Sequence, residues 1–140
     1  MSAPAAASPA TAGGTTPVTM TNWSVQYQTN AGQTWTVLAT LNGTVPAYSY
    51  YLVQLGNSGG TDGGVLPTAQ ATGAQNISGA QGKIALVNTN TALPNGCATP
   101  PQATVVDRVQ YGNNTAPCSE VAAAQGPSNN QVAVTRKVGG

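Results

Sequence analysis

Apolar and polar residues alternate along several short stretches of this chain, and the alternation predicts β-strands. In residues 23–28, Trp23, Val25 and Tyr27 alternate with serine and glutamine, which is typical of a strand with one buried face. Residues 34–41 form a similar stretch after an Asn-Ala-Gly turn. The two segments together predict an antiparallel hairpin.

Residues 48–55 are the most apolar run, and both of their faces carry apolar side chains. This pattern predicts a strand in the centre of a sheet. A long polar connection covers residues 56–80, and a short helical turn is expected at residues 120–125. The remaining strands are expected at residues 83–88, 105–111 and 131–138.

Composition favours an all-β chain with a single domain. The 140 residues include 17 glycines and 10 prolines, and 22 of the hydrophobic residues are alanine. Frequent turns and a thin core of valine and leucine fit a β-fold better than a helical one. Residues 1–16 are a flexible arm of Ala, Ser, Pro, Thr and Gly, and residues 17–140 form the predicted domain. The arm is either a disordered linker or a segment that pairs with another chain.

The chain carries very little charge, which limits the classes of partner. It has four basic and three acidic residues, or 5% charged residues, against about 25% in ordinary domains. So few cations form no basic patch for nucleic acid. No apolar stretch is long enough to span a membrane.

The sequence offers little for catalysis or metal binding. It contains no histidine, and its only carboxylates are Asp62, Asp107 and Glu120. A hydrolase with paired carboxylates would need Asp107 and Glu120 in one cleft. The favoured alternative is that Asp107 and Arg108 bind neighbouring charges or backbone amides and fix their strand. We therefore expect no enzyme, no cofactor and no metal site.

The two cysteines, Cys97 and Cys118, flank the predicted strand at residues 105–111. They form either one disulfide or two separate buried thiols. A disulfide, which we favour, would stabilise the fold by roughly 3 kcal/mol in the chain-entropy model. It would place the protein outside a reducing cytosol, in an extracellular or cell-surface location. No signal peptide is visible in this sequence.

Carbohydrate is the other chemistry that the sequence suggests. Exposed aromatic rings stack on sugars, although alternation directs most of the candidates into the core; the candidates are Trp23, Trp35, Tyr48, Tyr50 and Tyr111. Sequons for N-linked glycans occur at Asn22, Asn42, Asn76 and Asn113.

Five motifs occur in a characteristic order along the chain. They are Trp23-Ser-Val-Gln-Tyr with Trp35, Tyr50-Tyr51-Leu-Val-Gln, Gly82-Lys-Ile-Ala-Leu-Val-Asn, Val105-Val-Asp-Arg-Val-Gln-Tyr-Gly, and Arg136-Lys137. Together they resemble the bacterial form of the lamin-tail domain, over roughly residues 16–138. The resemblance implies an immunoglobulin-like antiparallel β-sandwich of extracellular and surface proteins, without enzymatic activity.

The family's two opening strands have no counterpart before Trp23. Another chain fills the gap, the arm folds back, or the natural chain is longer. We expect a structural module that self-associates as a homo-oligomer or filament, with Val18, Thr19 and Met20 as the donated strand. The alternative is a protein- or glycan-binding module of a larger secreted or cell-surface protein.

Overall fold

The computed structural model describes residues 14–56, 67–97 and 103–112, which contain six β-strands and no helix. The all-β prediction is confirmed for this part of the chain. The strands are β1 (Val18–Gln28), β2 (Thr36–Val45), β3 (Val53–Leu55), β4 (Ala71–Gly73), β5 (Gly82–Val87) and β6 (Val105–Tyr111).

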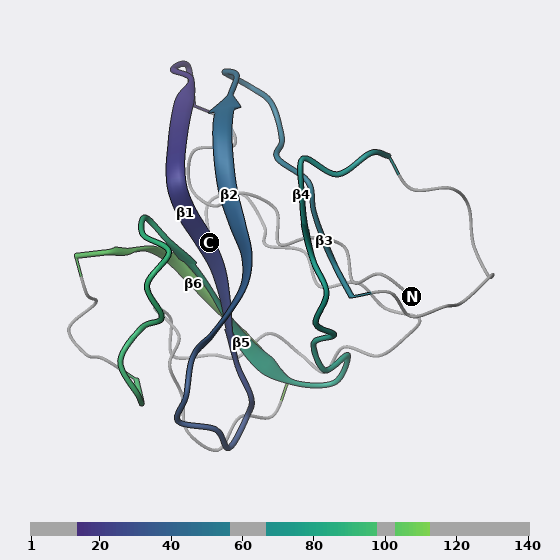
Figure 1. Ribbon diagram of the computed structural model, residues 1–140, viewed down its shortest axis with the longest axis vertical. Helices are drawn as coiled ribbons and strands as arrows, with labels where there is room; N and C mark the ends of the chain where they lie inside the picture. The colour runs from purple at the N-terminus through teal and green to yellow at the C-terminus, as the bar shows by residue number, and fades with distance from the viewer. Residues whose placement is uncertain (1–13, 57–66, 98–102, 113–140) are drawn as a thin grey trace.

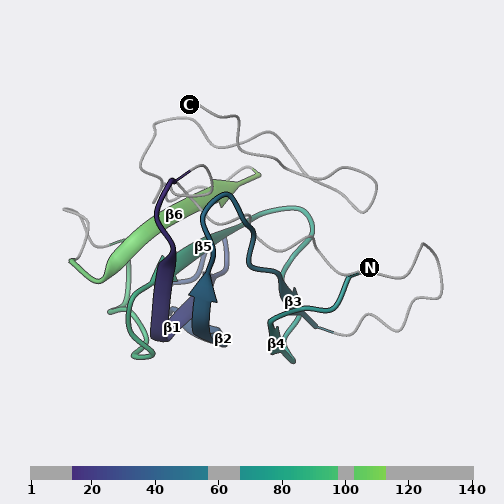
Figure 2. The same cartoon turned by 90° about the horizontal axis from the view of Figure 1, so that it is seen from above.

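Four strands form one antiparallel sheet in the order β2-β1-β5-β6, and β3 and β4 form a separate parallel pair. The β1–β2 ribbon extends beyond β5 and β6, and the β3–β4 pair lies beside β2 (Figures 1 and 2). Because β5 pairs with β1 over Ser24–Gln28 only, the first half of β1 has β2 as its sole strand neighbour among the described residues.

The predicted hairpin is confirmed as β1 and β2, and it is longer than the alternation indicates. Pairing continues past Trp23 to Val18, which lies opposite Val45. The register shifts twice, and at one of these bulges Asn22 has a φ of 53°. A positive φ in a side-chain-bearing residue marks a local kink, and asparagine tolerates it better than most residues.

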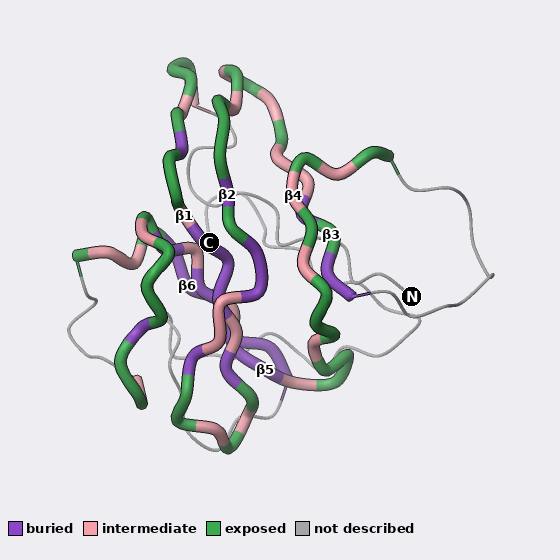
Figure 3. The backbone as a smooth tube through the Cα atoms, viewed as in Figure 1, coloured by how far each residue is buried: buried purple, intermediate pink, exposed green. Residues whose placement is uncertain are grey.

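The main core lies between one face of the sheet and the β3–β4 pair. Alternate residues of β1 and β5 point into it, as the sequence pattern predicts. Figure 3 shows the lower half of the ribbon buried and the end that extends past β5 mostly exposed. The buried members of this core are Met20, Val25, Leu38, Ala39, Leu41, Val53 and Leu55.

The prediction of a central strand at residues 48–55 is wrong. Only Val53–Leu55 is a strand, and it pairs with β4 instead of entering the main sheet. Tyr48 has a φ of 56°, a conformation that interrupts any extended run. The Leu52 amide then donates to the Gln70 side chain (2.7 Å).

Strand β4 lies inside the segment that the sequence presents as a polar connection. Its Ala-Thr-Gly sequence has no apolar alternation, so no pattern could reveal it. Gly73 lies so close to β2 that an added Cβ would overlap the Leu38 carbonyl oxygen. The close approach of β4 to β2 therefore depends on a glycine at this position.

The short strands predicted at residues 83–88 and 105–111 are confirmed as β5 and β6. Strand β6 lies at one end of the described sheet order, and β2 lies at the other. The helical turn predicted at 120–125 and the strand at 131–138 lie outside the described residues, as does the arm up to residue 13.

Candidate functional site

Polar side chains on one face of β1 bind the loop that follows β5. Gln26 accepts a hydrogen bond from the Leu93 amide (2.8 Å) and donates to the Thr91 carbonyl (2.9 Å). Ser24 donates through its hydroxyl to the Thr89 carbonyl (2.6 Å). Side chains two residues apart thus bind backbone groups of alternate loop residues, so that the loop is held much as a neighbouring strand would be.

Lys83 is buried at the next position on this face, with 1% of its surface exposed. Its Nζ donates to Gln28 Oε1 (2.9 Å) and to the Asn30 carbonyl (3.1 Å), which are both neutral acceptors. Gln28 Nε2 in turn donates to the carbonyls of Gln33 (2.9 Å) and Gly96 (3.3 Å). Burial lowers the pKa of the Lys83 amine from its ordinary value, because desolvation disfavours the charged form.

The polar side chains of β1 were expected to face solvent, and the structure corrects this. Ser24, Gln26 and Gln28 are between 0% and 1% exposed. Both faces of the second half of β1, Ser24–Gln28, are therefore buried, one against the apolar core and the other under the loop. Alternation identified the strand correctly but could not show that a loop rich in Asn, Thr and Pro covers its polar face.

Asp107 and Arg108 are buried on opposite faces of β6. Asp107 Oδ1 accepts a hydrogen bond from the Arg108 amide (2.8 Å), and a backbone amide is one of the partners that the sequence analysis expects for Asp107. Arg108 lies opposite Ala85, and its Nε is buried without a hydrogen-bond partner in the described structure. Asp62 and Glu120 lie outside the described residues, so the pairing of Asp107 with Glu120 stays untested.

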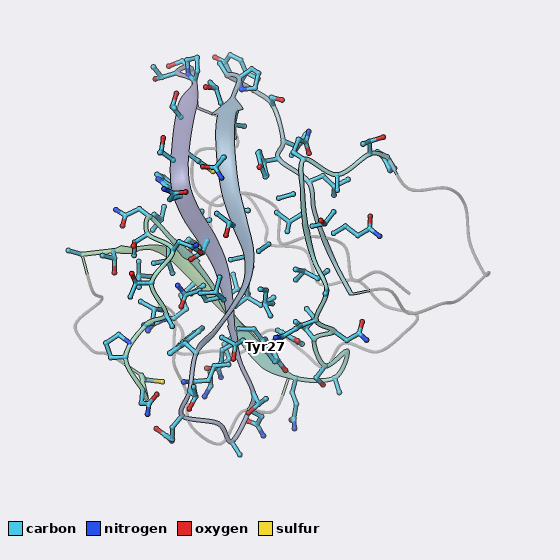
Figure 4. The ribbon with its side chains drawn as sticks, viewed as in Figure 1. Tyr27 is labelled. Atoms are coloured by element: carbon cyan, nitrogen blue, oxygen red, sulfur yellow. The ribbon has the colours of Figure 1, made fainter. Side chains whose placement is uncertain are left out.

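Two tyrosines meet over Gly82, where a Cβ would lie 2.5 Å from the Tyr27 ring and 2.9 Å from the Tyr111 hydroxyl. Tyr111 donates to the Ser78 carbonyl and Tyr27 accepts from the Ser78 amide (3.4 Å). Tyr27 is labelled in Figure 4, near the crossing of β1 and β5. Burial, and secondarily the neighbouring Tyr27, raise the pKa of the Tyr111 hydroxyl well above its usual range. The sequence does not predict this tyrosine pair, because no local pattern links Tyr27, Ser78 and Tyr111.

The five aromatic candidates for sugar stacking fall into two groups. Trp35 and Tyr111 are buried and Trp23 is half-buried, whereas Tyr48 and Tyr50 are 68% and 72% exposed. The exposed pair lies in the turn that follows β2.

One hydrogen bond closes that turn, and two others anchor it to neighbouring segments. The Tyr48 amide donates to the Gly14 carbonyl (3.3 Å), and the Ser49 amide donates to the Pro46 carbonyl (3.2 Å). The Tyr51 hydroxyl donates to the Asn42 carbonyl (2.9 Å). The turn is thus tied both to the residues before β1 and to the ribbon.

The predicted donor segment begins β1 and is paired within its own chain. Val18, Thr19 and Met20 lie opposite Val45, Thr44 and Gly43 of β2. The Thr19 and Thr44 hydroxyls are 3.1 Å apart, so they form a hydrogen bond across the two strands.

Three sequon asparagines are exposed in the structure, and Asn113 lies outside the described residues. Asn42 Oδ1 accepts a hydrogen bond from the Asn22 amide (2.9 Å), so these two meet at the bulge. An added Cβ at Gly56 would overlap the side chain of Asn76. The Asn22 sequon differs from those at Asn42 and Asn76 because its Ser24 hydroxyl is fully buried.

Cys97 is half-buried at the end of the loop that follows β5, and it is not a free thiol. Cys118 lies outside the described residues, so the pairing of these two cysteines stays a prediction.

Within the described part of the chain, no group of three or more His, Cys, Asp or Glu side chains could hold a metal ion. No helix there has the length and apolar character needed to cross a membrane.

Comparisons with protein families, with curated proteins and with solved structures found no match to this chain.

Proposed function

We propose that this protein is a non-catalytic, extracellular structural module that self-associates through β-strand pairing. Its fold is proposed to be a lamin-tail-like, immunoglobulin-like sandwich, on the strength of the five motifs and their order. The four-stranded sheet and the β3–β4 pair packed against it support a layered β-fold, although a parallel pair departs from the antiparallel pattern of immunoglobulin domains.

The observation that carries this proposal is the open edge at the start of β1. The strand has 11 residues, and β5 covers only Ser24–Gln28 on the side away from β2. Over residues 18–23, that side has no partner strand in the described structure. Unpaired amides and carbonyls along a strand edge are a template for another strand.

The β1–β2 ribbon has no charged residue that would hinder the pairing of another strand at this edge. Proteins usually protect edge strands with lysine, proline or a bulge. Residues 14–56 contain no charged side chain, and the bulge around Asn22 interrupts the edge in the described structure. The exposed residues beside the edge include Thr19 and Thr21, which have high β-propensity.

The structure changes the role proposed for Val18–Met20. Because these residues already pair with β2, we propose that their free edge accepts a strand and is not itself donated. Two ribbons joined edge to edge would give a closed dimer with twofold symmetry. Pairing of this edge with a different edge would give head-to-tail growth into a filament.

The experiment places a lysine at the edge. Thr21→Lys puts a charge on the exposed β1 edge, and Gln54→Lys puts the same charge on the exposed face of β3 as a matched control. We expect wild-type protein and Gln54→Lys to assemble with rising concentration in light scattering and negative-stain images. Thr21→Lys should remain monomeric with an unchanged circular dichroism spectrum. A wild-type chain that is monomeric at every concentration would refute the proposal, as would equal assembly of both variants.

The exposed tyrosines favour a second candidate function, the binding of neutral glycans. Tyr48 holds a strained positive φ while exposing its ring, and such strain is often kept at functional sites. The absence of charge in residues 14–56 suits an uncharged sugar better than an ionic partner. We expect neutral polysaccharide in a native gel to retard the wild type and Tyr51→Phe, and not the double variant Tyr48→Ala with Tyr50→Ala. Equal mobility of all three proteins with and without polysaccharide would exclude this function.

A further inference from the structure

Asparagine is followed directly by glycine at two places in the chain, Asn42-Gly43 in β2 and Asn95-Gly96 in the loop after β5. Both asparagine side chains are exposed. In such a pair the glycine amide nitrogen can attack the side-chain carbon Cγ of the asparagine, because glycine has no side chain to obstruct the approach. The attack forms a cyclic imide, and the contacts around each pair decide how readily it occurs.

Asn42 accepts hydrogen bonds at both of its oxygen atoms. The Asn22 amide donates to Oδ1 (2.9 Å), and the Tyr51 hydroxyl donates to the Asn42 carbonyl (2.9 Å). The first bond stabilises the negative charge that develops on Oδ1 when Cγ is attacked. The second bond is made to the peptide group that joins Asn42 to Gly43. It therefore stabilises the anion that this group becomes when the Gly43 nitrogen loses its proton.

The backbone at this pair departs from regular strand geometry. Gly43 has a φ of 110°, and a Cβ added there would have no heavy atom within 4 Å. The register of β1 and β2 shifts between Met20 and Trp23, so that Asn42 lies across from the bulge. An irregular backbone next to free space leaves room for the Gly43 nitrogen to move toward Cγ.

The Asn95-Gly96 pair is held in the opposite way. The Gly96 amide donates to the Gln33 carbonyl (2.6 Å), so the nitrogen that would attack is already bound. The Gly96 carbonyl accepts from Trp35 Nε1 (2.9 Å) and from Gln28 Nε2 (3.3 Å), and both of these side chains are buried. These contacts restrain Gly96 on both sides of its Cα and oppose the attack on Cγ of Asn95.

We propose that Asn42 is a site of spontaneous deamidation in the folded protein, activated by the Asn22 amide and the Tyr51 hydroxyl. The Gly43 nitrogen gives its proton to hydroxide and forms a bond with Cγ of Asn42. The bond between Cγ and Nδ2 then breaks, and ammonia leaves after taking up a proton from water. A water molecule opens the cyclic imide at either of its carbonyl carbons, which gives aspartate or isoaspartate at position 42.

The reaction changes the charge of the ribbon. Its product carries a carboxylate in a part of the chain, residues 14–56, that has no charged side chain. This carboxylate lies beside the bulge, across from Asn22. Charge beside a strand edge acts against the addition of another strand. Deamidation would therefore weaken the self-association proposed above as the protein ages; this consequence rests on that proposal, whereas the reaction itself does not.

The experiment compares the rates of deamidation at Asn42 and Asn95 within the same chain. The proteins are the wild type, Tyr51→Phe and, as a matched control, Tyr50→Phe, which alters an exposed neighbouring tyrosine. Each comes from a host that adds no N-linked glycan and is aged in dilute solution at mildly alkaline pH, both folded and in urea. Mass spectrometry of peptides detects the replacement of carboxamide by carboxylate, and chromatography separates aspartate from isoaspartate.

In the folded wild type, Asn42 should react faster than Asn95, and urea should lower the ratio of the two rates. Tyr51→Phe should slow the reaction of Asn42 about fivefold, the factor that one hydrogen bond of about 1 kcal/mol supplies to a rate. Tyr50→Phe should leave the Asn42 rate unchanged. In urea the three proteins should react at the same rate, because the contacts of the folded chain are then lost.

Two results would overturn the proposal. The first is a ratio of the Asn42 rate to the Asn95 rate that is no higher in the folded chain than in urea, since the structure then does not select the site. The second is an Asn42 rate in folded Tyr51→Phe that equals or exceeds that of the wild type. The hydroxyl would then restrain the peptide group or leave it unaffected. Circular dichroism of the aged samples checks that the three chains remain folded without urea.

Discussion

At the scale of single residues, buried polar side chains join segments that are far apart in the chain. The Gln26 amide is bonded at both its oxygen and its nitrogen, to backbone groups of a loop more than sixty residues away. Each such bond contributes about 1 kcal/mol when made, and a buried amide left without partners costs more than that. The same logic explains Tyr111, whose hydroxyl is buried and donates to the Ser78 carbonyl.

Removal of the Tyr111 hydroxyl should have an effect that depends on pH. Near neutral pH, Tyr111→Phe should lower the free energy of unfolding by about 1 kcal/mol, because the bond to Ser78 is lost. The folded state keeps Tyr111 protonated, since its pKa is raised, while the unfolded tyrosine ionises above about pH 10. The wild type should therefore lose about 1.4 kcal/mol per pH unit relative to the variant above that pH.

Denaturant unfolding of both proteins between neutral pH and about pH 11 checks this prediction. Lys83 is present in both chains, so its own titration cancels in the difference. A difference between the two proteins that stays constant across this range would show that Tyr111 ionises equally in the folded and unfolded chains.

At the scale of elements, two glycines let neighbouring strands approach. An added Cβ at Gly73 would meet the Leu38 carbonyl of β2, whereas one at Gly82 would meet the Tyr27 ring and the Tyr111 hydroxyl. A backbone carbonyl in a sheet cannot move without displacing its strand, while a tyrosine ring can rotate. The two sites therefore differ in how well they accommodate a methyl group.

We predict that Gly73→Ala destabilises the protein more than Gly82→Ala. Overpacking in a well-packed region costs typically about 1–3 kcal/mol, and we expect Gly73→Ala at the upper end of that range and Gly82→Ala at the lower end. Thermal and denaturant unfolding of both variants gives the ranking. The opposite order would mean that the tyrosine pair is more rigid than the contact of β4 with β2.

At the scale of the whole molecule, charge is distributed unevenly. The first 61 residues carry none, and within the described structure the three charged residues lie on β5 and β6. The exposed ribbon is therefore neutral, and under the proposed self-association its contacts with another copy would be hydrogen-bonded and apolar, not ionic. Such contacts are not weakened by salt in the way that surface ion pairs are.

Assembly of the wild-type chain should accordingly be nearly independent of ionic strength. Between roughly 0.01 M and 1 M salt the Debye length falls from about 30 Å to about 3 Å, which screens any contact between exposed charges. We expect the same particle size by light scattering over this range. Dissociation at high salt would place charged residues in the interface and contradict the role of the neutral ribbon.

The sequence by itself determined the class of fold and most of its strands. Alternation around Trp23 and the turn at residues 30–32 specify the hairpin, because side-chain direction in a strand has a period of two. The positions of β5 and β6 also follow from local pattern.

Only the tertiary structure decided which faces are covered and which edges are open. A run such as residues 48–55 is apolar enough for a central strand, but one positive φ at Tyr48 and the anchored turn around it keep most of it out of the sheet. The buried side chains of Gln26 and Lys83 have polar sequence signatures that normally indicate a solvent-facing surface. Their burial depends on partners distant in the chain, and so does the length of β1 that β5 leaves unpaired. Such contacts are set by packing in three dimensions, which no local pattern of residues records.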